Sequence, residues 1–242
     1  MLLPKLRQKW QNLGHSLLQG MAKSVPKACL LCQQPHQQKY ALCQYCYLEY
    51  CQPWAHCLSC DKPISKNALL CAACCQPKHI VISACHYHSP LGQQIPSFKS
   101  GWQLALQPVL CQLLQQRIRL FKQAFPQIKI NSLVPIPSHI YKLKARGFNP
   151  AWVIANDLSN RLSTPLVDDK LFKIKPTQDQ AGLDNKQRQR NLLGSFHCRH
   201  NLADANIALV DDVYTTGATI NEAAKALGLK QAIVCCWARA KR

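Results

Sequence analysis

The segment ALVDDVYTTGAT, residues 208–219, restricts the fold of this chain more tightly than any other stretch. Its apolar start predicts a buried strand, which Asp211 and Asp212 follow, and a hydroxyl-rich loop then leads into a helix. Open α/β sheets bind their ligands where strands end. Loop 215–219 would offer backbone N–H groups and hydroxyls to a phosphate at a helix N-terminus. The two carboxylates can accept hydrogen bonds from vicinal ribose hydroxyls, so the segment predicts a sugar-phosphate site.

Apolar runs and helical patterns alternate along the second half of the chain. We expect strands at 80–85, 132–137, 207–210 and 232–237, and helices at 108–121, 150–162 and 218–227. Asn149 and Pro150 suit the N-cap and first turn of the middle helix, and Gly228 is a natural stop for the last one. This alternation predicts an α/β domain with a largely parallel sheet over residues 79–242.

The cysteines form a repeat. Two C-x-x-C pairs separated by ten residues occur twice, and the second copy lies 28 residues after the first. Two such pairs can surround one tetrahedral Zn²⁺ with four thiolates. The expected ligands are Cys29, Cys32, Cys43, Cys46, Cys57, Cys60, Cys71 and Cys74. We therefore predict a small double zinc-ribbon module over residues 25–78 that holds two structural zinc ions.

The spacing leaves the pairing of these ligands open. Two sequential sites, two cross-braced sites and a single surviving site all agree with it. Nearby side chains could also replace a ligand, and these are Cys51, Cys75, His36, His56 and His79. A disulfide framework is the alternative to zinc. It is disfavoured because no signal peptide is visible and the total of 15 Cys is odd.

The first 24 residues have the pattern of an amphipathic helix. Apolar side chains recur every three or four positions, at Leu3, Leu6, Trp10, Leu13, Leu17 and Met21. Such a helix packs on its own protein, binds a partner or lies on a lipid surface. The chain has no stretch of 18 or more apolar residues, so we expect no transmembrane segment.

Basic residues are concentrated in the first two thirds of the chain. Residues 1–156 contain 17 Lys and Arg but only two acids, Glu49 and Asp61, and the whole chain has a formal net charge of +19. A charge of this size favours polyanionic partners. Aromatic residues are interleaved with the cations, at Trp10, Tyr40, Tyr45, Tyr47, Tyr50, Trp54, Tyr87 and Trp102. This combination suits single-stranded DNA, although the aromatics could instead pack around the metal sites.

Residues 208–220 resemble the phosphoribosyl pyrophosphate (PRPP) motif of type I phosphoribosyltransferases. By this resemblance Asp211 and Asp212 hold the ribose hydroxyls, and the following loop holds the 5-phosphate. The implied PRPP-binding residues are Asp211, Asp212, Val213, Tyr214, Thr215, Thr216, Gly217, Ala218, Thr219, Pro135, Ile136 and Arg190. The implied catalytic residues are Asp211, Asp212, Arg146 and Arg188. The arginines would neutralise phosphate oxygens; the alternative is that they are solvated surface residues.

Further elements resemble the ComF family. They are VPIP at 134–137, KARGFN at 144–149, QAGL at 180–183, RQRN at 188–191 and GSF at 194–196, together with the paired C-x-x-C units, Tyr87 and the pair Phe98-Lys99. The resemblance covers about residues 29–242 and implies a type I phosphoribosyltransferase-like domain preceded by the zinc-ribbon module. Pro150 stands where the family usually has Gln, so any contact made by that side chain is lost.

The resemblance implies a role in natural competence, the uptake and processing of DNA by bacteria. We expect a protein of the cytoplasm or the membrane periphery that binds PRPP or a related sugar phosphate with Mg²⁺. Its other expected partners are single-stranded DNA and competence or DNA-translocation proteins. The alternative is an active phosphoribosyltransferase, similar to amidophosphoribosyltransferases, that acts on a nucleotide-related acceptor with no direct DNA role. The motif leaves transferase activity open, and only their positions make His139 and His197 candidate bases.

Overall fold

The computed structural model describes residues 27–38, 41–51, 56–65, 68–74, 77–101, 104–176, 192–199, 202 and 206–240. The contacts divide the chain into two compact units, Met1–Tyr50 and Cys51–Arg242. The predicted helix at 1–24 lies outside the described residues, and the expected domain boundaries near residues 25 and 78 stay predictions. The second set of C-x-x-C pairs falls in the same compact unit as the α/β sheet.

The first unit contains a two-stranded ribbon and a helix. β1 (Lys27–Ala28) pairs antiparallel with β2 (Pro35–His36), so the first C-x-x-C pair lies in the turn between them. The chain then forms α2 (Gln44–Tyr50). Cys46 is the buried residue of this helix, which carries one predicted ligand of the second C-x-x-C pair into the interior.

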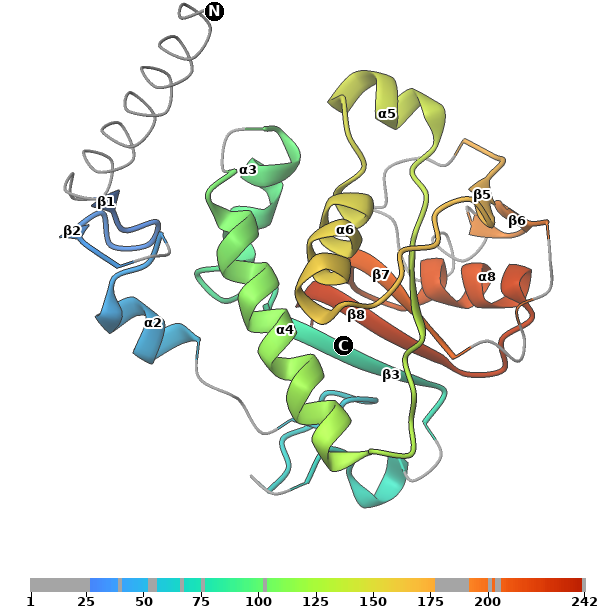
Figure 1. Cartoon of the computed structure of the whole chain (residues 1–242), viewed down its shortest axis with the longest axis horizontal. Coiled ribbons are helices and arrows are strands. Elements are labelled where there is room, and N and C mark those ends of the chain that lie inside the picture. Colours follow the sequence, from blue (N-terminus) through green and yellow to red (C-terminus); the bar gives the residue numbers. More distant parts are fainter. Residues whose placement is uncertain are drawn as a thin grey trace, which may run out of the picture. The chain divides into compact units, whose positions relative to one another are not determined.

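A four-stranded parallel sheet forms the centre of the second unit (Figure 1). Its strands are β3 (His79–His86), β4 (Ser132–Pro135), β7 (Ile207–Tyr214) and β8 (Ala232–Arg239), in the order β3-β8-β7-β4. All three strand pairings are parallel, which confirms the predicted α/β class. All carboxyl ends of these strands therefore meet at one edge of the sheet.

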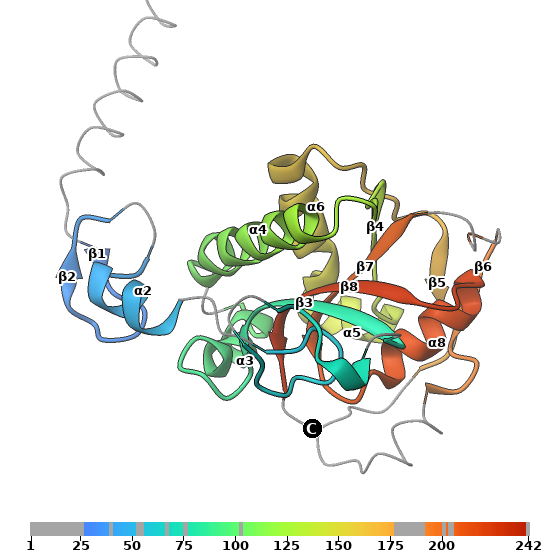
Figure 2. The same cartoon turned by 90° about the horizontal axis from the view of Figure 1, so that it is seen from below.

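Helices cover both faces of this sheet (Figure 2). α4 (Leu106–Ala124) contacts β3 and β8, while α6 (Pro150–Leu162) contacts β4 and β7. α8 (Ala218–Leu227) packs on the opposite face, where its apolar side chains join those of the strands in one core. Because neither face meets water, the strands read as continuous apolar runs, and seven of the eight residues of β3 are buried.

One strand is longer than its apolar run predicts. β7 was expected to end at Val210, but its pairing with β8 continues, with Asp211 opposite Cys236 and Val213 opposite Ala238. The two aspartates are therefore held on a regular strand. A hydrogen-bonded strand fixes the backbone of both residues more firmly than a turn would.

Smaller elements complete the second unit. They are the 3₁₀ turns η1 (Ala72–Cys74) and η2 (Gly92–Gln94), the helices α3 (Ile95–Lys99) and α5 (Ile140–Arg146), and the antiparallel strands β5 (Leu171–Lys173) and β6 (Phe196–Cys198). Sequence periodicity predicts none of these short pieces. In the part of the chain that the structure describes, no helix combines the length and apolarity needed to cross a bilayer.

Candidate functional site

The eight predicted metal ligands form two groups of four. Cys29, Cys32, Cys43 and Cys46 make the first group, and Cys57, Cys60, Cys71 and Cys74 make the second. Within each group all four Sγ atoms lie within 4.8 Å of one another. Four sulfurs around one Zn²⁺ at about 2.3 Å are roughly 3.8 Å apart. The Cys32–Cys43 and Cys60–Cys71 sulfur pairs are 3.7 and 3.6 Å apart. The pairing is thus sequential, and both groups fit structural zinc.

The backbone around each group also favours a bound cation. The Cys43 N–H points at Cys29 Sγ over 3.4 Å, and the Cys71 N–H points at Cys57 Sγ over 3.3 Å. Burial raises the pKa of both Cys29 and Cys57, but surrounding backbone N–H groups outweigh it and lower each pKa to about 6. A thiol that ionises this readily is suited to metal binding at neutral pH.

The alternative metal ligands do not join these groups. His79 uses both ring nitrogens elsewhere, with Asn221 Oδ1 at 2.7 Å and the Ala232 N–H at 3.3 Å. Cys51 is buried, and burial raises its pKa to about 11. Cys75 lies outside the described residues. His36 and His56 are absent from both groups of converging atoms among the residues described.

The aspartate pair lies at the carboxyl end of β7, where a ligand of a parallel sheet is expected. The Asp212 N–H donates to Asp211 Oδ1 over 2.9 Å, and Lys99 Nζ lies 2.8 Å from Asp212 Oδ2. Burial, together with the neighbouring Asp212 carboxylate, raises the pKa of Asp211 to about 7. The pair thus combines one exchangeable proton with one carboxylate held by a lysine.

The loop after β7 has the backbone expected of a phosphate cradle. Gly217 is the N-cap of α8 and has φ 78°, a conformation that side chains with a Cβ rarely adopt. A Cβ at this position would lie 2.5 Å from Tyr214 Oη, so the tyrosine packs directly against the glycine. The Ala218 N–H faces Thr216 Oγ1 over 3.4 Å, which folds the loop back over the start of the helix.

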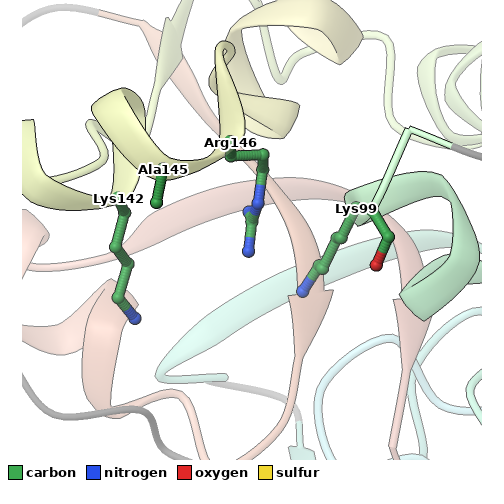
Figure 3. A pocket seen from close by; sticks show the side chains of 5 residues that line it. Lys99, Lys142, Ala145 and Arg146 are labelled. Atoms are coloured by element: carbon green, nitrogen blue, oxygen red, sulfur yellow. The ribbon is translucent and has the colours of Figure 1, made fainter.

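Cations from separate elements line a cavity next to the aspartates, and Lys99 belongs both to this cavity and to the ion pair with Asp212. A cavity of about 360 Å³ is lined by Lys99, Ser100, Lys142, Ala145 and Arg146. Figure 3 shows Arg146 extending from α5 and Lys99 from α3 toward the same opening. Lys173 on β5 interacts electrostatically with both Lys142 and Asp211. Burial and the Lys142 ammonium lower the pKa of Lys173 to about 8, and the Asp211 carboxylate acts in the opposite direction. Such a cavity is suited to a ligand with several negative charges.

The structure brings some of the other predicted residues to this edge. Pro135 pairs with Val210 at the end of β4, and the Ile136 N–H donates to the Val210 carbonyl over 2.8 Å. Both therefore lie beside the residue that precedes Asp211. Arg188 and Arg190 lie outside the described residues. The two candidate bases are placed differently: His139 caps α5 through Nδ1, and His197 is exposed on β6.

Three cations of the site were missed by the sequence analysis. Lys99, Lys142 and Lys173 come from elements far apart in the sequence, and only the fold brings them together. The first of them lies in the Phe98-Lys99 pair, which fits the ComF family pattern but was given no role in the site. For the other two, charge alone does not separate a site lysine from a solvated one.

Known proteins resemble this chain over most of its length. Competence protein F of Haemophilus influenzae is 30% identical over 209 residues, which cover 82% of this chain and 90% of that protein. The chain belongs to the ComF family. This ComF family member also matches the DNA utilization protein YhgH of Salmonella typhimurium, with 26% identity over 208 residues, 84% of the chain and 92% of the relative.

A third relative matches a shorter part of this ComF family member. Competence protein ComFC of Bacillus subtilis is 36% identical over 110 residues, which are 44% of this chain and 42% of that protein. No protein-family profile matches the chain. The names of these relatives refer to competence and to the use of DNA.

Proposed function

We propose that this ComF family member binds PRPP at the carboxyl end of β7 and serves in the uptake or processing of DNA. The observation that carries the proposal is the adjacent placement of two carboxylates, a glycine-capped helix N-terminus and a cavity lined by cations. Carboxylates are suited to ribose hydroxyls, and the helix N-terminus to a phosphate. The cations are suited to a pyrophosphate group.

Each group has a distinct part in the proposed binding. Asp212 exchanges its contact with Lys99 for the ribose hydroxyls, and Lys99 then turns to the pyrophosphate beside Arg146. The N–H groups at residues 215–219 hold the 5-phosphate. Mg²⁺, when bound with PRPP, would neutralise oxygens of the pyrophosphate and ribose. The contribution of the protein is to hold the sugar in one orientation and to offset charge that develops when pyrophosphate leaves.

The second part of the proposal is a contact between the basic cysteine-rich region and single-stranded DNA. Two aromatic side chains of α2 are exposed, Tyr45 at 71% and Tyr50 at 38%. Exposed rings on a basic module can stack on bases while lysines neutralise the backbone. The names of the relatives, which refer to competence and DNA utilization, support this assignment over a purely metabolic one.

Calorimetry with PRPP and Mg²⁺ tests the first part. Wild type should release heat on titration, and Asp212→Asn should bind at least about tenfold more weakly because it loses the charged acceptor. Asp169→Asn is the matched control, since the Asp169 side chain is 69% exposed and forms an ion pair with its neighbour Lys170. Absence of heat with wild type, or equal affinity for both variants, would contradict the proposal.

Fluorescence anisotropy with labelled single-stranded DNA tests the second part. Tyr45→Ala should weaken binding by about fivefold through lost stacking. For all variants, affinity should fall by about tenfold or more between 50 and 200 mM salt. A salt-independent affinity would remove the electrostatic argument. Release of pyrophosphate on a panel of nucleobases and nucleotides, without any DNA binding, would instead favour the alternative of an active transferase.

A further inference from the structure

The two cysteine groups have the same backbone but different surroundings at one repeated position. Gln33 and Asp61 are 28 residues apart, each directly follows a C-x-x-C pair, and both have positive φ, 60° and 66°. Glycine fits such a conformation best. Gln33 is exposed, whereas Asp61 is only 8% exposed. Because a buried carboxylate at positive φ is doubly unfavourable, Asp61 needs partners that stabilise it in the second group.

These partners lie at the ends of two strands of the sheet. Asp61 Oδ1 lies 3.8 Å from Arg239 Nε, and Asp61 Oδ2 lies 3.7 Å from His86 Nδ1. Arg239 is the residue where β8 ends, and His86 is the residue where β3 ends. The carboxylate thus joins the second cysteine group to the same edge of the sheet that carries Asp211 and Asp212.

Arg239 makes a second set of contacts with the metal-binding turn. Its guanidinium donates to the carbonyls of Cys57 at 3.4 Å and Leu58 at 3.1 Å, and also to that of Ser59. These carbonyls belong to the turn whose N–H groups face the Cys57 thiol. The side chain of Arg239 is only 3% exposed, so its hydrogen bonds compete little with water. Arg239 therefore ties three successive carbonyls of this turn to the end of β8, and the Val81 N–H of β3 also donates to the Leu58 carbonyl over 2.8 Å.

The other side of Arg239 leads to the phosphate loop. Its guanidinium carbon lies 5.5 Å from the centre of the Tyr214 ring, a cation–π distance. Tyr214 packs against Gly217 so closely that a Cβ there would collide with the phenol oxygen. The Ala240 N–H also donates to the Tyr214 carbonyl over 2.9 Å. A continuous series of contacts thus runs from the turn at Cys57 through Arg239 and Tyr214 to the loop.

We propose that the second cysteine group positions the phosphate loop through Asp61 and Arg239, so that metal at this group and sugar phosphate at the loop stabilise each other. The inference rests on the proposed PRPP site. The first cysteine group belongs to a different compact unit, and the proposed coupling concerns the second group alone. Asp61 and Arg239 are positioning residues, because neither is placed against the sugar phosphate itself. Coupling between two binding sites is reciprocal, so it can be measured from either end.

The first measurement follows zinc. In the full chain carrying Cys32→Ser, which removes the first group, the zinc that remains belongs to the second group. Its loss to a zinc-selective chelator should slow by about fivefold when PRPP and Mg²⁺ are present, relative to Mg²⁺ alone. The companion chain with Cys60→Ser retains the first group, and PRPP should leave its zinc loss unchanged. Equal rates with and without PRPP in the Cys32→Ser chain would overturn the proposal.

The second measurement follows PRPP. Asp61→Gly and Gln33→Gly both relax a backbone at positive φ, but only the first removes a buried carboxylate. By calorimetry Asp61→Gly should bind PRPP about tenfold more weakly, while Gln33→Gly should bind it like wild type. Arg239→Lys, which keeps the charge but loses the planar fork, should resemble Asp61→Gly and guards against a folding defect in that variant.

The outcomes separate this inference from the function on which it rests. Wild type that binds no PRPP contradicts both proposals. Wild type that binds PRPP, with Asp61→Gly and Arg239→Lys equal to it in affinity, contradicts the coupling alone. Weaker binding by both variants, together with PRPP-protected zinc in the second group, supports both.

Discussion

At the scale of single residues, the candidate site holds like charges close together in partly buried positions, where their ionised forms are disfavoured. Asp211 is held beside a second carboxylate, and Lys173 is held beside Lys142. Each arrangement costs free energy in the unliganded chain, because like charges and partial burial both disfavour the ionised form. A ligand that carries both hydroxyls and negative charges would relieve both. The strain is therefore itself an indication of a binding site.

The titration of Asp211 gives the first prediction. Burial and the Asp212 carboxylate raise the pKa of Asp211 from its ordinary 3.8 to about 7, so between these pH values the folded state holds a proton that the unfolded state has lost. Stability therefore falls as pH rises from about 4 through 7. Asp211→Asn removes this loss. The unfolding free energy of Asp211→Asn, measured relative to wild type, should therefore increase by about 2 kcal/mol between pH 5.5 and 7.5.

Denaturant unfolding of both proteins at the two pH values measures this difference. Asp211 is surrounded by Asp212, Lys99 and Lys173, so the same comparison in Asp212→Asn shows how much of the effect comes from the neighbouring carboxylate. A gain that stays constant from pH 5.5 to 7.5 would show that Asp211 keeps an ordinary pKa.

At the scale of elements, the predicted strands and helices are confirmed where the apolar pattern is long. α4, α6 and α8 begin and end within a few residues of their predicted positions, and Asn149 and Gly228 cap them as expected. α3 and α5 could not be predicted, because α3 has only five residues and α5 has no buried residue to give it a periodic apolar face. These two helices supply Lys99, Lys142 and Arg146. The half of the candidate site that carries the aspartates was thus readable from the sequence, whereas of the cations supplied by these two helices only Arg146 was predicted.

The cap of α6 carries the second prediction. Asn149 Oδ1 accepts from the Ala151 N–H at 3.2 Å and from Ser138 Oγ at 3.0 Å, and its Nδ2 donates to the Ile136 carbonyl at 3.0 Å. Asn149→Ala should lower the unfolding free energy by about 2 kcal/mol, since it removes a cap and a partly buried hydrogen-bond network. Asn160→Ala on the exposed side of the same helix should change it by less than about 0.5 kcal/mol.

Urea denaturation of the two variants beside wild type makes this comparison. Because Asn149 also ties the segment that follows β4 to the start of α6, the Ala variant should loosen α5 and weaken PRPP binding. An Asn149→Ala protein as stable as Asn160→Ala would show that the cap contributes nothing measurable.

At the scale of the whole molecule, the two cysteine groups belong to different parts of the fold. The first lies in the compact unit Met1–Tyr50, while the second belongs to the unit that contains the sheet. The duplication was evident from the spacing, but this division was not. The second group meets the sheet through contacts such as those of Arg239, which is 179 positions from Cys60 and lies where β8 ends beside β3. Contacts of such sequence separation leave no local pattern.

Zinc removal gives the third prediction. Elemental analysis should find two zinc ions per chain, and one in each of the variants Cys32→Ser and Cys60→Ser. Thermal unfolding, followed by the near-ultraviolet circular dichroism to which the buried Trp237 of the sheet contributes, should occur at a lower temperature in Cys60→Ser alone. A lower transition temperature in Cys32→Ser as well would show that the first group also supports the sheet.

The strand order has a consequence for how this chain acquires its fold. β8 follows the other described strands in the sequence, yet it lies between β3 and β7. β3 therefore leaves the ribosome early and has no partner within the sheet until residues 232–239 have been made. During synthesis its apolar edge needs protection, and non-local parallel pairing of this kind closes slowly. The nascent chain is thus an expected client of chaperones, and the candidate site at the ends of the strands can be complete only after the final strand has paired.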